Sequence, residues 1–412
     1  MNDEGKNDEL LMLNDELTNS SLITQHSALK VPEIRFKGFS GEWQNKEIGS
    51  ILAETKRPVE LIDNELYQLV TVKRRNEGVI PRAILKGKDI LVKNYYSVKA
   101  GDYLISKRQV VHGANGIVPA SLDNAVVSNE YLVVTDGDEI TAKFWTVISK
   151  KTEMHKLFFI SSYGVDIEKL VFDVTDWKNR RITIPNVVEQ NKITDHFQKL
   201  DSLINQHQQQ HDQLSNLKKA MLEKMFPKAG ETIPEIRFKG FSGEWEVSAL
   251  RDISEITTGK LDANAMKKNG KYDFYTSGIK KYKIDIPAFE GPAITIAGNG
   301  ATVGYMHLAD GEFNAYQRTY VLTNFKANRY FLFCNIGKEL PIKISQEVRA
   351  GNIPYIVLDM LTDLEIKLPF EKEEQTAIGN YFQKLDALIN QHQQQITKLT
   401  HIKQACLSKM FV

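Results

Sequence analysis

The sequence predicts an α+β fold in which two mostly β domains are separated by a pair of long antiparallel coiled-coil helices. Three observations support this prediction. The segment Phe197–Gln210 returns almost unchanged at Phe382–Gln395, and a shorter motif also occurs twice. Each copy of the motif is followed by β-branched runs of strand length with turn residues between them. The chain therefore carries an internal duplication, for which we expect pseudo-twofold symmetry.

Each copy of the longer repeat has the heptad spacing of a coiled-coil helix. Apolar residues recur at alternating steps of four and three, and Gln, Asn, Lys and Asp fill the outward positions. A seam this narrow cannot fold alone in water, and the nearest partner is the other copy. We expect the helix pair to meet through these seam residues: Phe197, Leu200, Ile204, His207, Phe382, Leu385, Ile389 and His392.

The direction of the helix pair follows from the connection between the helices. A helix from Val187 to about Phe226 would be roughly 60 Å long at about 1.5 Å per residue. The intervening domain of about 140 residues has an expected radius of gyration of about 14 Å, so its chain ends should not lie that far apart. The helices should therefore be antiparallel.

The shorter motif marks the start of each β domain. VPEIRFKGFSGEW at Val31–Trp43 returns as IPEIRFKGFSGEW at Ile233–Trp245, and each domain closes on a β-like run before Pro185 or Pro369. The predicted parts are an N-terminal extension at 1–30, a first β domain at 31–186, a first spacer helix at 187–228, a second β domain at 229–370 and a second spacer helix at 371–412.

The duplication also predicts that the two ends of the chain are neighbours. The second copy of the short motif directly follows the first helix, so it must lie near the end of that helix. If the two halves are related by a twofold axis, Val31–Trp43 should lie beside Met410 and Phe411 at the end of the second helix.

Within the β domains, two Asn-Gly pairs predict hairpins. Gly101–Ser106 precedes a loop containing Asn115-Gly116, and Ala293–Ala297 precedes Asn299-Gly300. Asn-Gly between apolar runs is a strong hairpin signal. The segments 128–134 and 316–322 then follow in corresponding places, which suggests that the domains are relatives whose sequences have diverged.

Bulk properties exclude several classes of protein. The net charge is only +1, so contacts to nucleic acid must come from local clusters such as Lys73–Arg75, although a solvated face also explains such a cluster. Two distant cysteines do not indicate a disulfide framework. Because no apolar run approaches the roughly 20 residues of a membrane span and no signal peptide is evident, we expect a cytoplasmic protein without membrane association.

Catalytic and metal-binding motifs are missing from the sequence. It contains neither the G-x-x-x-x-G-K-[ST] phosphate loop nor the Asn-Pro-Pro-aromatic motif of adenine methyltransferases, nor a nuclease's paired carboxylates. His207 and His211 have a spacing that zinc sites use, but Ile396 replaces the equivalent second histidine. We therefore predict no catalytic residues and no metal site, and interpret His207 as a polar seam residue that fixes register.

Two diverged domains with near-identical helical spacers and PEIRFKGFSGEW openings resemble the specificity subunits of type I restriction-modification systems. The segments GDYLISK, VVSNEYLVV, GKLDANAM, AGNGATVGY and FNAYQRTYVL are similar to that family's target-recognition domains. The resemblance implies a non-catalytic subunit whose domains each read one half of a split double-stranded DNA target. It also implies that the helices set the gap and that two methyltransferase subunits and the restriction (translocase) subunits dock around them. S-adenosylmethionine, ATP and Mg would then be used by those partners, with no cofactor in this chain.

Candidate DNA-reading residues are those whose side chains recognise base edges. Arg and Lys pair with guanine, Asn and Gln with adenine, and loops beside the predicted hairpins carry them. Tyr316 could stack on a displaced base or simply pack. The candidates are Lys107, Arg108, Gln109, His112, Asn115 and Asn129 in the first domain, and Lys260, Asn299, Tyr316, Gln317 and Arg318 in the second. The alternative hypothesis is a protein–protein scaffold whose β domains bind a peptide or glycan, which predicts no dependence on DNA.

Overall fold

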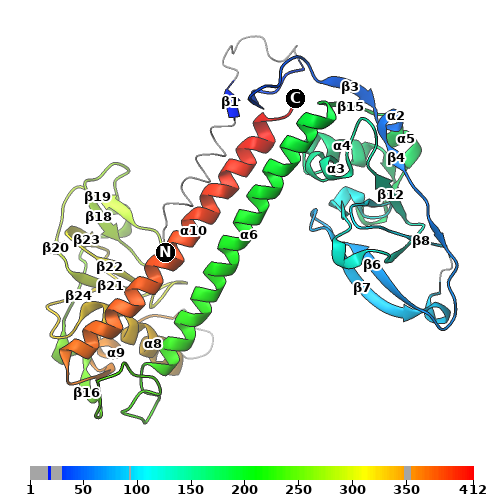
Figure 1. Cartoon of the computed structure of the whole chain (residues 1–412). Helices are drawn as coiled ribbons and strands as arrows, with labels where there is room; N and C mark the ends of the chain where they lie inside the picture. Colours follow the sequence, from blue (N-terminus) through cyan, green and yellow to red (C-terminus); the bar gives the residue numbers. More distant parts are fainter. Residues whose placement is uncertain (1–16, 20–29, 92–93, 348–353) are drawn as a thin grey trace. The chain divides into compact units, whose positions relative to one another are not determined.

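The computed structural model describes residues 17–19, 30–91, 94–347 and 354–412, and these form two compact units. Unit 1 comprises residues up to Asn205 together with Thr397–Val412, and unit 2 comprises Gln206–Ile396. Each unit therefore holds one β domain and a part of both long helices (Figure 1). Leu17–Asn19, strand β1, pairs with β2 (Ile34–Phe36), while the rest of the predicted N-terminal extension lies outside the described residues apart from Lys30.

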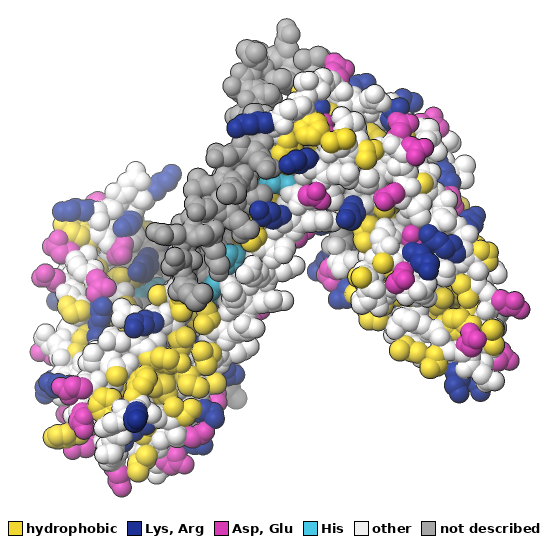
Figure 2. All heavy atoms as spheres, in the orientation of Figure 1, with side chains coloured by type: hydrophobic (Ala, Val, Ile, Leu, Met, Phe, Trp, Pro, Cys, Tyr) yellow, Lys and Arg dark blue, Asp and Glu magenta, His cyan; other side chains and the backbone are white. Residues whose placement is uncertain are grey.

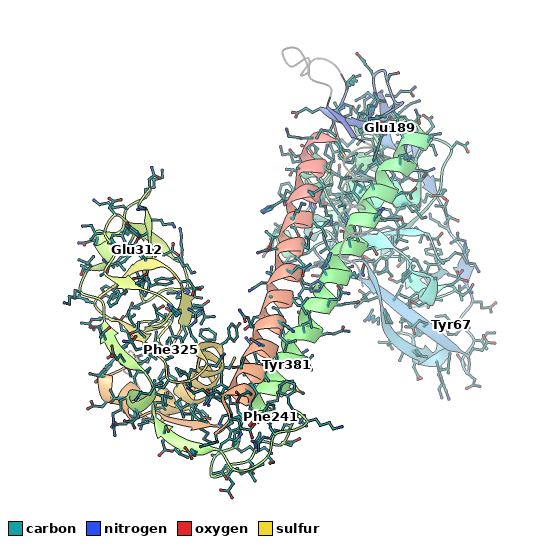
Figure 3. All side chains as sticks on the ribbon, turned by 60° about the vertical axis from the view of Figure 1, so that its left-hand side comes forward. Tyr67, Glu189, Phe241, Glu312, Phe325 and Tyr381 are labelled. Carbon is teal, nitrogen blue, oxygen red and sulfur yellow. The ribbon has the colours of Figure 1, made fainter. Side chains whose placement is uncertain are left out.

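The long helices are α6 (Val187–Lys224) and α10 (Lys372–Lys409). They run side by side and antiparallel within each unit, and Figure 3 labels Glu189 on α6 and Tyr381 on α10. In unit 1, Lys403 donates to Asp201, and in unit 2 the Nζ of Lys218 lies 2.5 Å from Oδ1 of Asp386. Residues later in α6 thus pair with residues earlier in α10, which confirms the predicted antiparallel direction.

The β domain of unit 1 contains two main sheets. The first has the order β10-β9-β12-β4 and is antiparallel throughout. The second has the order β5-β8-β11-β6-β7, in which β11 and β6 are parallel. The strands are β4 (Ala53–Glu54), β5 (Pro58–Val59), β6 (Leu66–Val72), β7 (Val79–Lys86), β8 (Tyr95–Ser97), β9 (Tyr103–Ser106), β10 (Asn115–Ile117), β11 (Val126–Ser128) and β12 (Tyr131–Thr135).

The β domain of unit 2 repeats this topology. Its sheets have the orders β22-β21-β24-β17 and β20-β23-β18-β19, with β18 and β23 parallel. Unit 1 has one additional strand, β5, at the edge of its second sheet. When β5 is left out, the strands of the two domains, matched in chain order, occupy the same positions in the sheets. The strands are β17 (Glu255–Thr258), β18 (Tyr272–Tyr275), β19 (Tyr282–Ile284), β20 (Phe289–Glu290), β21 (Ala293–Ala297), β22 (Met306–Ala309), β23 (Glu312–Ala315) and β24 (Thr319–Thr323). The domains are thus relatives in fold, as the sequence suggested.

A short two-stranded sheet closes each domain just before its helix. In unit 1, β3 (Gln44–Glu47) pairs with β15 (Arg181–Ile184). In unit 2, β16 (Glu246–Ala249) pairs with β25 (Glu365–Leu368). The predicted β-like runs before Pro185 and Pro369 are therefore confirmed. The short elements beside them are α2 (Ile48–Ile51), α5 (Val174–Lys178), α7 (Leu250–Ile253), α9 (Leu358–Thr362), β13 (Ser162–Tyr163) and β14 (Val171–Phe172).

The β domains contain more helix than the sequence predicted. Unit 1 contains α3 (Ala142–Ile148) and α4 (Thr152–Ile160), and unit 2 contains the longer α8 (Arg329–Glu347). Leu332, Ile336 and Leu340 recur at helical spacing and are buried. Pro341 lies inside α8 and would normally signal the end of a helix, which explains why the pattern was missed.

The two ends of the described chain meet in unit 1, as the duplication predicted. The rings of Trp43 and Phe411 make an edge contact with centroids 5.8 Å apart, and Lys409 lies 3.2 Å from Glu33. Trp245 and Phe226 make the equivalent contact in unit 2 at 5.9 Å. Each copy of the short motif therefore packs against the C-terminal end of a long helix inside its own unit (Figure 1).

Candidate nucleic-acid interface

Three chain segments meet at one end of the four-stranded sheet in unit 1. The connection after β9, the residues before β12 and the residues after β4 share this end because the strands are antiparallel. Backbone hydrogen bonds join the segments: Lys107 N–H donates to the Glu130 carbonyl at 2.9 Å, and Thr55 N–H to the Val133 carbonyl at 3.0 Å. We call this end of the sheet the loop edge of unit 1.

Unit 2 has an equivalent loop edge at the matching end of its sheet. Gly298 N–H donates to the Arg318 carbonyl at 2.8 Å, and Gln317 N–H to the Leu261 carbonyl at 2.8 Å. The equivalent strands β21, β24 and β17 supply the three segments. All five second-domain candidates lie on these segments, so the structure brings together Lys260, Asn299, Tyr316, Gln317 and Arg318.

The first-domain candidates other than Asn115 lie on the loop edge of unit 1, where hydrogen bonds and ion pairs hold several of them. Lys107 Nζ donates to the Asn129 carbonyl at 2.7 Å, and partial burial lowers the pKa of this lysine. Arg108 Nε lies 2.6 Å from Glu130 Oε2, and this hydrogen bond raises the pKa of the arginine. The Arg108–Glu130 pair is exposed, so solvent weakens it and the arginine can exchange partners at small cost.

Asn115, a predicted DNA-reading residue, is buried rather than exposed on the loop edge. Its side chain is 2% exposed, and Asn115-Gly116 lies in strand β10 rather than in a turn. The hairpin itself exists, since β9 and β10 are antiparallel, but the connection between them is residues 107–114. In unit 2 the hairpin prediction is confirmed, because Asn299-Gly300 lies between the antiparallel strands β21 and β22.

Arg74 was not among the predicted DNA-reading residues, yet it contacts one of them, Gln109, and the acidic residue Glu168. Arg74 Nε donates to Gln109 Oε1 at 2.7 Å, and its guanidinium lies 2.5 Å from Glu168. His112 Nε2 lies 3.5 Å from the same carboxylate. The basic run at 73–75 is visible in the sequence. Only the fold shows that it lies beside the β9–β10 connection.

In unit 2, several residues hold the loop edge and its neighbouring segments in place through hydrogen bonds. Asn299 Oδ1 accepts a hydrogen bond from Ser277 Oγ at 2.5 Å, and Thr302 donates to the Ser277 carbonyl. His307 Nε2 lies 3.3 Å from the Gly278 carbonyl, and burial lowers the pKa of this histidine. Exposed Tyr355 forms a backbone bridge with Asn299. Of these supporting residues, Thr302 lies in the segment AGNGATVGY, whereas Ser277, His307 and Tyr355 lie outside the segments that resemble the family.

Some residues of the predicted helix seam are buried in the domain cores, and others lie between the two long helices. Phe197 and Leu200 are buried in the core of unit 1, with Ile204 packed against it. Phe382 and Leu385 are buried in the core of unit 2, and Ile389 is half-buried. His207 Nδ1 lies 2.9 Å from His392 Nδ1, so the two duplicated histidines face each other across the helix pair.

The charge on both units is mixed. On the face shown in Figure 2, basic and acidic side chains are intermingled in both units, consistent with the net charge of +1. Among the described residues, no group of three or more His, Cys, Asp and Glu side chains is arranged to hold a metal ion. Within the same residues, no helix has the length and apolar character needed to cross a membrane.

Comparison with known proteins identifies the family. The model of the type I restriction modification DNA specificity domain matches residues 40–216 and 242–401. The EcoDI specificity subunit of a type I restriction enzyme from Escherichia coli is 35% identical over 161 residues, which are 39% of this chain and 35% of that protein. The MjaVIII specificity subunit from Methanocaldococcus jannaschii is 22% identical over 411 residues and covers 88% of both chains.

A solved structure has the same fold. The S subunit of a type I restriction-modification system from M. genitalium superposes with a TM-score of 0.67 at 16% identity, covering 93% of this chain and 99% of that one. This likeness supports two related β domains joined by paired antiparallel helices. With the family model matched in both domains, the chain belongs to the DNA specificity subunits of type I restriction-modification systems, the non-catalytic members of those systems.

Proposed function

We propose that the two β domains, at 31–186 and 229–370, each read one half of a bipartite double-stranded DNA target. The observation that carries this proposal is the pair of loop edges. The same three segments of the same topology meet in both units, but their side chains differ. A common scaffold with different exposed side chains is what independent recognition of two unrelated half-sites requires.

The side chains of the loop edges suit recognition of base edges in the major groove. Arg108 and Gln109 in unit 1, and Gln317 and Arg318 in unit 2, carry the groups that pair with guanine and adenine. A bidentate pair of this kind contributes about 1–3 kcal/mol of discrimination against the wrong base. The candidates in both domains, without Asn115, are therefore the proposed recognition set.

We further propose that α6 and α10 set the gap between the half-sites and provide the docking surface for partner subunits. Two methyltransferase subunits and the restriction (translocase) subunits are the proposed partners, acting in the cytoplasm with S-adenosylmethionine, ATP and Mg. Support comes from the near-identity of the duplicated helix sequences, because two equivalent surfaces suit two copies of one partner.

The test is sequence-selective binding by the chain together with its methyltransferase subunits. The DNA target is first identified by sequencing modified bases in DNA from cells that express the complex. Binding is then measured on equal-length duplexes with and without that target, across a salt series. The proposal predicts tighter binding to the target duplex at every salt concentration. Equal affinity for both duplexes after salt correction would refute it.

A further inference from the structure

A hairpin from the second sheet docks onto the loop edge in each unit. In unit 1, β6 and β7 are joined by the tip Lys73–Gly78. In unit 2, the equivalent strands β18 and β19 are joined by the tip Thr276–Lys281. We call these two segments the hairpin tips. Their sequences share no motif, yet they occupy the same position in the shared topology.

The tip of unit 1 is fixed to the β9–β10 connection by backbone hydrogen bonds. Arg75 N–H donates to the His112 carbonyl at 2.7 Å, and Asn76 N–H to the Gly113 carbonyl at 2.8 Å. Arg75 and Asn76 have φ values of 61° and 55°, a left-handed conformation that costs free energy for residues other than glycine. Positive φ at both central residues is the geometry of a tight hairpin turn, and this turn presents the two N–H groups to the β9–β10 connection.

Gly116 shows how closely this tip approaches the sheet. A Cβ at Gly116 would lie 2.8 Å from Cα of Gly78, so only glycine fits at that place in β10. This contact gives the Asn115-Gly116 pair a structural role other than a turn. The tip therefore lies directly against the sheet and the β9–β10 connection.

The tip of unit 2 is fixed by side chains instead. Ser277 Oγ donates to Asn299 Oδ1, and Thr302 donates to the Ser277 carbonyl. The next residue, Gly278, lies against His307. Different bonds thus hold an equivalent tip against an equivalent loop, which indicates that the docked position itself is what both domains share.

Both tips expose basic side chains beside the loop edge. Lys73 and Arg75 are exposed in unit 1, and Lys280 and Lys281 are exposed in unit 2. Lys281 Nζ lies over the ring of Tyr275, 5.3 Å from its centroid, and Lys280 lies 5.5 Å from that of Tyr282. The aromatic rings hold these two lysines without neutralising their charge. Lys73 lies 3.4 Å from Glu77 in an exposed ion pair, which is weak enough for a phosphate to replace the carboxylate.

We propose that each hairpin tip is a phosphate-binding arm, which contacts the DNA backbone beside the bases that the loop edge of its own unit reads. This inference rests on the proposed function and adds contacts that lie outside the recognition set. Lysine acts on phosphate mainly as a point charge, and such contacts fix the register of a protein on the duplex without carrying sequence information. The tips should therefore contribute affinity and salt dependence, but not the choice of bases.

The experiment compares variants of the full chain assembled with its methyltransferase subunits. Tip variants are Lys73→Gln with Arg75→Asn, where asparagine tolerates the left-handed backbone, and Lys280→Gln with Lys281→Gln. The matched control is Lys86→Gln with Lys88→Gln: Lys86 pairs with Leu66 at the far end of the same β6–β7 hairpin, and Lys88 lies just beyond it. The probes are the target duplex and an equal-length duplex that lacks the target.

Each tip variant should reduce the slope of log affinity against log salt by about 1.8, at about 0.9 per lost phosphate contact. The loss of affinity should be the same on both duplexes, and the methylated sequence should not change. The control should keep the wild-type slope. Lys280→Arg with Lys281→Arg should also keep it, which separates loss of charge from loss of folding.

Tip variants with the slope of the control would overturn the proposal while leaving sequence-selective recognition intact. A change in the methylated sequence would also overturn it, because the tips would then read bases. Loss of all preference for the target duplex in the wild-type complex would instead refute the proposed function, and this inference with it.

Discussion

Arg35 and Glu189 form a buried bidentate ion pair that joins the first short motif to the start of α6. Arg35 Nε and Nη2 lie 2.7 Å from the two carboxylate oxygens, and Nη1 donates to the Gly41 carbonyl at 2.5 Å. Arg237 and Glu374 repeat the arrangement at the start of α10 in unit 2. The duplicated motif therefore fixes the start of one long helix through its arginine and packs on the end of the other through its tryptophan.

We expect Arg35→Ala to destabilise unit 1 by about 3–5 kcal/mol, because Glu189 would be left as a buried unpaired charge. Chemical denaturation followed by tryptophan fluorescence measures the change. The matched variant Arg237→Ala should act equally on unit 2. A double variant, Arg35→Ala with Glu189→Ala, should lose less than the sum of the single variants. Additive losses would show that the two side chains do not interact.

Both cysteines should be unreactive in the folded protein. Burial raises the pKa of the Cys406 thiol to about 11 and that of Cys334 to about 12. The thiolate is the reactive form, so alkylation at pH 8 should be slow until denaturant is added. Because the folded pKa values are raised, the thiols' contribution to stability is complete below about pH 9 and is lost as pH rises toward the folded values. Rapid labelling of native protein at pH 8 would contradict the described burial.

A circular permutant should fold and recognise the unchanged target. Trp43 and Phe411 are in contact, so a short linker from Val412 to about Lys30 can join the ends, and exposed Gly230 can supply the new ends. The denaturation midpoint and the methylated sequence are the measurements. A distance between labels at Lys37 and Lys409 provides the control. A separation comparable to the roughly 60 Å helix would contradict the juxtaposition of the ends.

The length of the helix pair should control the gap between the half-sites. Inserting seven residues after both Gln210 and Gln395 preserves the heptad register, so the two half-sites should stay the same while the gap lengthens. Inserting two residues at the same places shifts the seam and should destabilise the pair. Sequencing of modified bases measures both the half-sites and the gap between them. An altered half-site with an unaltered gap in the seven-residue variant would refute this role of the helices.

Sequence alone predicted the parts of the fold that repetition and periodicity encode. The heptad seams gave the helices, chain connectivity gave their direction, and the repeated motif placed Trp43 beside Phe411. The α8 helix was missed because Pro341 is tolerated within it. Asn115-Gly116 was misplaced because its glycine serves close packing against Gly78, which local turn chemistry does not reveal.

The candidate site was predicted as a set of segments rather than as a surface. The residues at 107–109 and 316–318 were selected for their chemistry, and the fold then placed them at equivalent sheet ends. Burial excluded Asn115, and burial depends on tertiary packing. The basic run that contains Arg74 is visible in the sequence, but its contact with Gln109, 35 residues away, depends on the fold.

The central claim is that the two loop edges read separate half-sites, and sequencing of modified bases in loop-edge variants tests it most directly. Arg108→Ala with Gln109→Ala changes unit 1, and Gln317→Ala with Arg318→Ala is the matched change in unit 2. We predict that each variant relaxes or changes the bases of one half-site, that the two variants affect opposite halves, and that the gap stays constant. A variant that alters both halves together, or both variants altering the same half, would contradict the account.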